Sequence, residues 1–193
     1  MKNTWPIWLS LLLLSGCFEE SQPPRELINS YSRPLTEQEL QAEADERDAE
    51  IIAQSSDQEE TFVILGTDEK IWHGSFNAIA YEYDDQTSDT SINSSLYRLS
   101  RNPQAKVSIY RGETFQWNNQ VKESRKGHIV IVINDIEIQK ELKKIRFIFQ
   151  DESQIITPIT EKKGVYFTYD ALKNCIGLEL LSSTDNVLYS KEF

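Results

Sequence analysis

The feature that most constrains this chain is an alternating hydrophobic pattern that begins near residue 60 and runs through the remaining sequence. Apolar side chains recur at every second position in runs around Ile145, Val165 and Ile176, which is the period of a half-buried β-strand. The run 128–133 is apolar at every position after His128, which indicates a central strand covered on both faces. A chain with this pattern is expected to fold into sheets.

Turn residues rather than helices separate the alternating runs. About nine or ten short strands in residues 60–193 predict a mainly β domain, an antiparallel β-sandwich, with a small closed β-barrel as the alternative. Within this domain, residues 138–144 have the spacing of a helical turn. The polar stretch 83–95 is expected to be a surface loop, the kind of segment in which binding residues are common.

The net charge of -11 is concentrated in one segment of the chain. Residues 18–60 hold 13 acidic and three basic residues, whereas residues 61–193 hold 18 acidic and 16 basic ones. An acidic balance argues against nucleic acid as a partner, because binding a polyanion requires Lys and Arg. The β domain itself is nearly neutral, so the overall acidity says little about what that domain binds.

Residues 36–55 are predicted to form an acidic helix that follows an extended segment. Three prolines interrupt regular structure in residues 17–35, which we interpret as a flexible tether. Thr36 and Glu39 have the spacing of a capping box at a helix start. The apolar face of this helix is weak, so we expect a solvated spacer, with a docking helix for a basic partner or disorder as the alternatives.

Residues 1–16 have the parts of a secretion signal. Lys2 supplies a positive charge, residues 5–14 are largely apolar, and the small residues Ser15 and Gly16 follow. An apolar segment of this length is too short to cross a bilayer as a helix, which takes about 20 residues. The start of the chain is therefore expected to be a signal peptide.

The segment Leu14-Ser15-Gly16-Cys17 resembles the lipobox of bacterial lipoproteins. The resemblance implies cleavage between Gly16 and Cys17 and attachment of lipid to the Cys17 thiol, which anchors the chain to a membrane. The next residue is Phe18 rather than Asp, so the resemblance also implies the outer membrane, facing the periplasm, in a Gram-negative host. An ordinary signal peptide with a coincidental cysteine is the alternative.

The sequence nominates no catalytic residue and no cofactor or metal. The seven glycines lie too far apart for a glycine-rich phosphate loop, and no G-x-S-x-G motif occurs. His73, His128 and Cys175 are widely separated and lack the local spacing of a zinc site. Cys175 stands beside Ile176 in an apolar run, so we expect it to be a small core residue.

Two sets of residues are candidates for binding. One is the group of acidic residues Asp84, Asp85 and Asp89 in the predicted loop. The other is an aromatic patch that would include Trp72 and Trp117, although packing in a core is the commoner role of alternating aromatic residues.

These features predict a lipid-anchored cell-envelope protein with a periplasm-facing β domain. We expect the domain to bind an envelope protein as an accessory or assembly factor rather than to act as an enzyme. The alternatives are an immunity lipoprotein that neutralises a toxin delivered to the periplasm, and a periplasmic hydrolase with unrecognised carboxylates.

Overall fold

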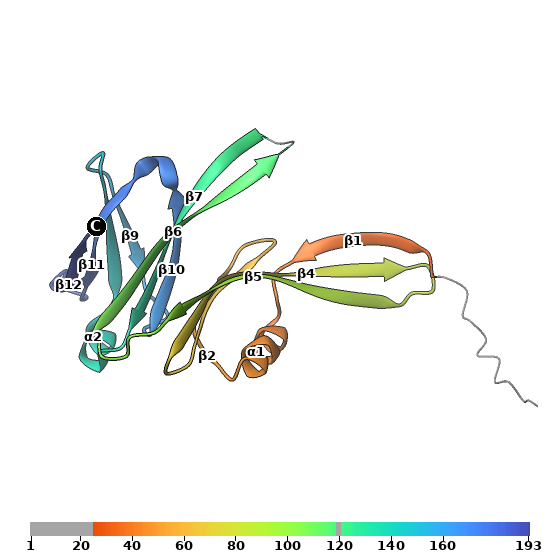
Figure 1. Cartoon of the computed structure of the whole chain (residues 1–193), viewed down its shortest axis with the longest axis horizontal. Coiled ribbons are helices and arrows are strands. Elements are labelled where there is room, and N and C mark those ends of the chain that lie inside the picture. Colours follow the sequence, from red (N-terminus) through yellow and green to blue (C-terminus); the bar gives the residue numbers. More distant parts are fainter. Residues whose placement is uncertain (1–24, 119–120) are drawn as a thin grey trace, which may run out of the picture.

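The computed structural model describes residues 25–118 and 121–193, with the side chains of residues 114–125 left out, and its secondary structure is mainly β (Figure 1). The strands are β1 Leu27–Arg33, β2 Glu50–Ser56, β3 Thr61–Gly66, β4 Lys70–Tyr83, β5 Ser88–Ser100, β6 Val107–Asn118, β7 Val121–Ile133, β8 Lys144–Phe149, β9 Gln154–Pro158, β10 Gly164–Asp170, β11 Cys175–Leu181 and β12 Val187–Glu192. The helices are α1 Glu37–Glu46, α2 Ile136–Glu141 and the 3-10 turn η1 Ala171–Lys173.

The strands form three antiparallel sheets, and within the described residues none of them closes into a barrel. Sheet A contains β1, β4, β3 and β2, with β5 paired to the other edge of β4. Sheet B has the order β10-β7-β6, and sheet C the order β12-β11-β8-β9. The mainly β fold of the prediction is confirmed, and the alternative of a closed barrel is not what forms.

Three hydrophobic clusters show how the layers stack. Sheets B and C enclose the largest cluster, in which the rings of Phe147 and Phe167 stack with their centroids 3.7 Å apart. A second cluster joins the other face of sheet B to sheet A, and a third joins the outer face of sheet A to α1. The order of layers is therefore α1, sheet A, sheet B and sheet C, so a third sheet and a helix are added to the predicted sandwich.

Strand β7 supplies the centre of this stack. Its residues Ile129, Ile131 and Ile133 face sheet C, and Val130 and Val132 between them face sheet A. All five are at most 1% exposed. A strand covered on both faces must be apolar at successive positions, so the predicted role of this run as a central strand is confirmed.

Part of sheet A extends beyond the stacked layers as an arm (Figure 1). The first half of β4 pairs with β3, whereas its second half pairs with β1 along the same edge. Strand β5 pairs with β4 along its whole length. We call β1 and the neighbouring halves of β4 and β5 the arm.

The segment that we interpreted as a tether contains β1. Residues 27–33 pair with residues 78–83 of β4, so within the described part of residues 17–35 the chain is already folded. The strand was missed because its side chains are exposed on both faces, apart from the partly buried Arg33. Without one buried face a strand has no alternating pattern to recognise.

The predicted acidic helix is shorter than residues 36–55. Helix α1 begins as expected, with Thr36 accepting a hydrogen bond from the Glu39 amide and Glu39 accepting one from the Thr36 amide. It ends at Glu46, and Asp48 then adopts a positive φ of 51°. Residues 50–56 form β2, and the buried Leu40 and Ala44 pack the helix onto sheet A instead of leaving it a solvated spacer.

The predicted surface loop at 83–95 is also largely a strand. A short turn joins Tyr83 to Thr87, with the Tyr83 amide donating to the Thr87 carbonyl at 3.1 Å. Strand β5 begins one residue later. Its first half is almost wholly exposed, so the polar composition that indicated a loop belongs to an edge strand of the arm.

We predict that Glu39→Gln lowers the free energy of unfolding by about 1 kcal/mol, measured by urea denaturation at pH 7. The Glu39 carboxylate receives two hydrogen bonds from the Arg33 guanidinium, at 2.7 and 2.8 Å, which help to lower its pKa to about 2. The control is Glu37→Gln in the same helical turn, which should change the free energy much less. Equal effects of the two variants would contradict this role of Glu39.

Candidate functional site

Two histidines meet where sheet A lies against sheet B. His73 projects from β4 and His128 from β7, and their ring centroids are 5.3 Å apart. Tyr97 on β5 stacks on His73 at 5.6 Å, and Tyr166 on β10 stacks on His128 at 6.0 Å. Four strands from two sheets thus build one cluster of four rings, which we call the histidine seam.

Both histidines are buried, with exposed fractions of 4% for His73 and 6% for His128. The Nδ1 atom of each ring is buried without a hydrogen-bond partner. On β6, Gly112 lies opposite His128 in the strand register, and a Cβ at Gly112 would stand 2.4 Å from His128 Nε2. A residue with a side chain at position 112 would therefore displace the His128 ring.

Burial controls the charge of the seam. It lowers the pKa of His73 to about 4, with a smaller contribution from the neighbouring His128, and it also lowers the pKa of His128. Burial likewise raises the pKa of Tyr166 to about 12, helped by Tyr97 and Glu60. At neutral pH the two histidine rings are therefore uncharged, and the seam packs as an aromatic cluster.

Sequence reasoning did not find this pair. His73 and His128 are far apart in the chain, and each stands in an ordinary alternating run. They come together only because sheet B packs against sheet A, and nothing in the local sequence predicts that contact.

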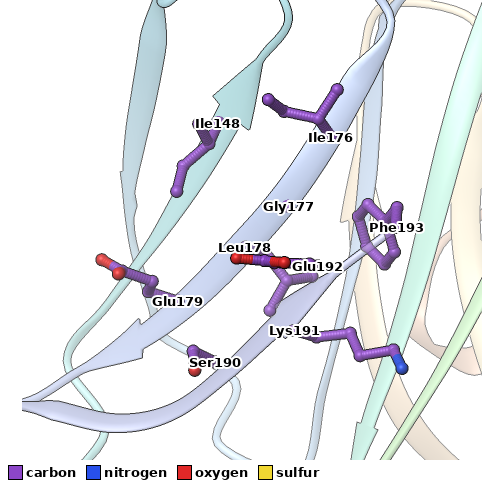
Figure 2. A pocket seen from close by; sticks show the side chains of 9 residues that line it. All are labelled: Ile148, Ile176, Gly177, Leu178, Glu179, Ser190, Lys191, Glu192 and Phe193. Atoms are coloured by element: carbon purple, nitrogen blue, oxygen red, sulfur yellow. The ribbon is translucent and has the colours of Figure 1, made fainter.

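A second feature is a hollow on sheet C (Figure 2). It has a volume of about 500 Å³ and is lined by residues of β8, β11, β12 and Phe193. Figure 2 shows Ile148, Ile176 and Phe193 around Gly177. Gly177, between these apolar groups, has no side chain and is itself buried.

The rim of the hollow combines exposed apolar groups with charge. Ile176 is 40% exposed and Phe193 37% exposed. Phe193 is held in place by the Arg111 guanidinium, which lies 4.3 Å from the ring centroid and donates a hydrogen bond to the Cys175 carbonyl. Glu179 also lines the hollow, and its carboxylate pairs with Arg146 at 2.8 Å. Such a surface suits an apolar side chain of a partner protein.

The structure keeps the three nominated aspartates together at the tip of the arm and places Trp72 far from them. Trp72 is half-buried and packs with the cluster that joins α1 to sheet A. Asp89 pairs with Arg25 at 3.0 Å at the far end of the arm, and its partner in the register, Tyr81, lies nine positions from Trp72 on β4, or roughly 30 Å.

Asp84 and Asp85 stabilise the turn of the arm. Asp84 accepts a hydrogen bond from the Glu26 amide at 3.3 Å, and Asp85 accepts one from the Thr87 amide at 2.9 Å. Hydrogen bonds from the Thr87 side chain and backbone lower the pKa of Asp85. These carboxylates therefore have structural partners in the arm.

Other nominated residues fall in different places. Trp117 lies outside the described side chains, and Gly16 and Cys17 lie outside the described residues. Cys175 is a fully buried free cysteine of the sandwich core, and burial raises the pKa of its thiol. Its expected role as a core residue is confirmed.

Comparisons with known proteins give no assignment: no family model, curated protein or solved structure matches this chain.

We predict that the protein loses stability as the pH falls below about 6.5. The unfolded chain takes up protons at the ordinary pKa of histidine, whereas the folded His73 does so only near pH 4. As the pH falls from the unfolded to the folded pKa, the free energy of unfolding therefore decreases. For His73 the loss reaches roughly 3 kcal/mol, at 1.36 kcal/mol per pKa unit. Urea denaturation across this range measures the loss.

The variant His73→Phe should reduce this pH dependence, because an aromatic ring remains while one of the two titrating histidines of the seam is removed. If the variant and the natural protein lose the same free energy of unfolding between pH 6.5 and pH 4, His73 does not control acid stability.

Proposed function

We propose that this chain is a lipid-anchored protein of the cell envelope whose β domain binds a partner protein in the periplasm. The resemblance of residues 14–17 to a lipobox supports the anchor at Cys17. Among residues 25–118 and 121–193, no helix is long and apolar enough to cross a membrane.

A lipid on Cys17 would also determine which end of the molecule lies near the membrane. Arg25 follows Cys17 by eight positions, so the chain between them spans at most about 30 Å even when fully extended. Arg25 lies at the tip of the arm, where its guanidinium stacks on Tyr83 and pairs with Asp89. An anchored Cys17 therefore keeps the tip of the arm near the bilayer surface.

The observation that carries the proposal is the position of the hollow. Sheet C and the tip of the arm lie at opposite ends of the long axis of the molecule (Figure 1). Anchored through the arm, the chain would present the hollow and its exposed Ile176 and Phe193 away from the membrane. This arrangement suits an accessory protein that holds a partner at a distance from the lipid surface.

We expect Cys17→Ser to abolish incorporation of radioactive palmitate and to release an unprocessed or soluble form of the chain. The substitution removes the thiol to which the lipid is attached. Labelling is measured in growing cells after immunoprecipitation, and Cys175→Ser serves as the control that should still be labelled. Palmitate on the Cys17→Ser chain would contradict the anchor.

We expect Ile176→Asp to reduce crosslinking of the chain to its partner in cells by at least tenfold, because a charge in the hollow cannot be desolvated against an apolar side chain. The measurement is crosslinking in cells followed by mass spectrometry. The matched control is Ile156→Asp, since Ile156 is 51% exposed on β9 of the same sheet but does not line the hollow.

Equal crosslinking by the two variants would contradict the assignment of the hollow as the binding surface. The identity of the captured protein separates the functions: an envelope component supports an accessory role, whereas a toxin supports an immunity protein.

A further inference from the structure

Strand β5 forms a long free edge of sheet A. In the described part of the chain it pairs with β4 and with no other strand. The register runs from Lys70↔Ser100 to Glu82↔Ser88 without a shift over all 13 residues. The opposite side of β5 is therefore an uninterrupted row of backbone groups.

Two hydrogen bonds fix which residues of β5 face that edge. The Arg101 amide donates to the Glu69 carbonyl at 2.8 Å, and the Tyr83 amide donates to the Thr87 carbonyl at 3.1 Å. In an antiparallel pair, hydrogen-bonded positions alternate with positions whose N–H and C=O groups point away. Odd-numbered residues of β5 thus bond to β4, and the even-numbered ones direct their backbone groups to the free edge.

A contact at the end of the strand agrees with this alternation. The Ser100 carbonyl accepts a hydrogen bond from the Tyr110 hydroxyl of β6 at 2.9 Å, so at this even position the carbonyl does point away from β4. The remaining outward positions are Ser88, Thr90, Ile92, Ser94, Leu96 and Arg98.

Most other edge strands of this protein carry features that hinder further pairing, and the regular edge strand β10 has only seven residues. Strands β1, β2, β6 and β12 each have a shift in the register with their neighbour, and β9 is short and ends at Pro158. Strand β5 has no such shift and contains no Pro, Gly or Lys. A long, regular edge without these features is a template for another strand.

We propose that the free edge of β5 binds an extended segment of the partner protein as an added β-strand. Main-chain hydrogen bonds from the even-numbered residues supply the affinity. On the face of the sheet that carries α1, Ile92 and Leu96 are half-buried against the cluster under that helix. The added strand would place apolar side chains at alternate positions beside these two residues and polar ones on its other face.

The occupant is a partner protein rather than a second copy of this chain, an argument that rests on the proposed anchor. Two β5 strands joined as an antiparallel pair point their arms in opposite directions. Two lipid anchors in one bilayer require both arms to point toward the same surface. An extended segment of another protein meets no such conflict.

The test uses the full-length chain in the cells that produce it. A photo-crosslinking amino acid, benzoylphenylalanine, replaces Thr90 or Arg98 in separate experiments, and the attachment points are mapped by mass spectrometry. We expect both probes to reach one segment of one protein, at points about eight residues apart, as the register of a single added strand requires. The absence of a crosslink, or attachment at scattered places, overturns the proposal.

Attachment to β5 of a second copy also overturns it, because the occupant would then be the chain itself. Ser94→Pro removes one outward N–H without removing a hydrogen bond to β4, and should reduce the Thr90 crosslink at least tenfold. Ser94→Ala keeps the N–H and should leave the crosslink unchanged. Circular dichroism confirms that both variants are folded, and Ser94→Lys, which keeps the N–H but adds a charge at the edge, should weaken the crosslink if Ser94→Pro does not fold.

This test separates the edge from the proposed function. Palmitate labelling that persists in Cys17→Ser would remove the argument against a second copy, whereas undiminished crosslinking of Ile176→Asp would overturn the assignment of the hollow as a binding surface. Neither result changes the spacing of attachment points that a strand on β5 requires.

Discussion

Burial of strand β7 on both faces is the interaction on which the rest of the structure depends. The five residues from Ile129 to Ile133 contact sheet C on one side and sheet A on the other, and each buried aliphatic side chain contributes about 1.5–3 kcal/mol. Because sheet B is covered twice, it joins the sandwich to the sheet that carries the arm. Without this shared layer the two parts would have no common core.

The histidine seam extends the contact between sheets A and B beyond the aliphatic side chains of β7. His128 follows the alternation of Val130 and Val132 toward sheet A, so it reaches His73 rather than solvent. Burial lowers the pKa of His128 and so favours its neutral ring, which makes the packing of the two sheets sensitive to pH. The hollow and the free edge of β5 lie outside the buried layers, where backbone and side chains are available to a partner.

The sequence predicted strands that bury at least one face, and it did not predict strands that bury neither face. The runs around Ile131 and Phe147 predicted strands because burial imposes a pattern on them. The capping box at Thr36 was predictable because it is a contact between residues three positions apart. Strand β1 and the first half of β5 were missed because both of their faces are largely exposed, so burial imposes no alternation of apolar and polar side chains. The histidine seam and the hollow depend on contacts between strands distant in the sequence, which local patterns do not encode.

The central claim is that the long axis of the molecule separates the proposed anchored end from the hollow on sheet C. It is tested most directly by energy transfer from a fluorophore on the full-length lipidated chain to an acceptor lipid in vesicles. The fluorophore is placed at Asp85→Cys in the tip of the arm or at Val187→Cys in sheet C, both exposed positions. The account predicts strong transfer from position 85 and weak transfer from position 187. Equal transfer from the two positions, or stronger transfer from position 187, would contradict it.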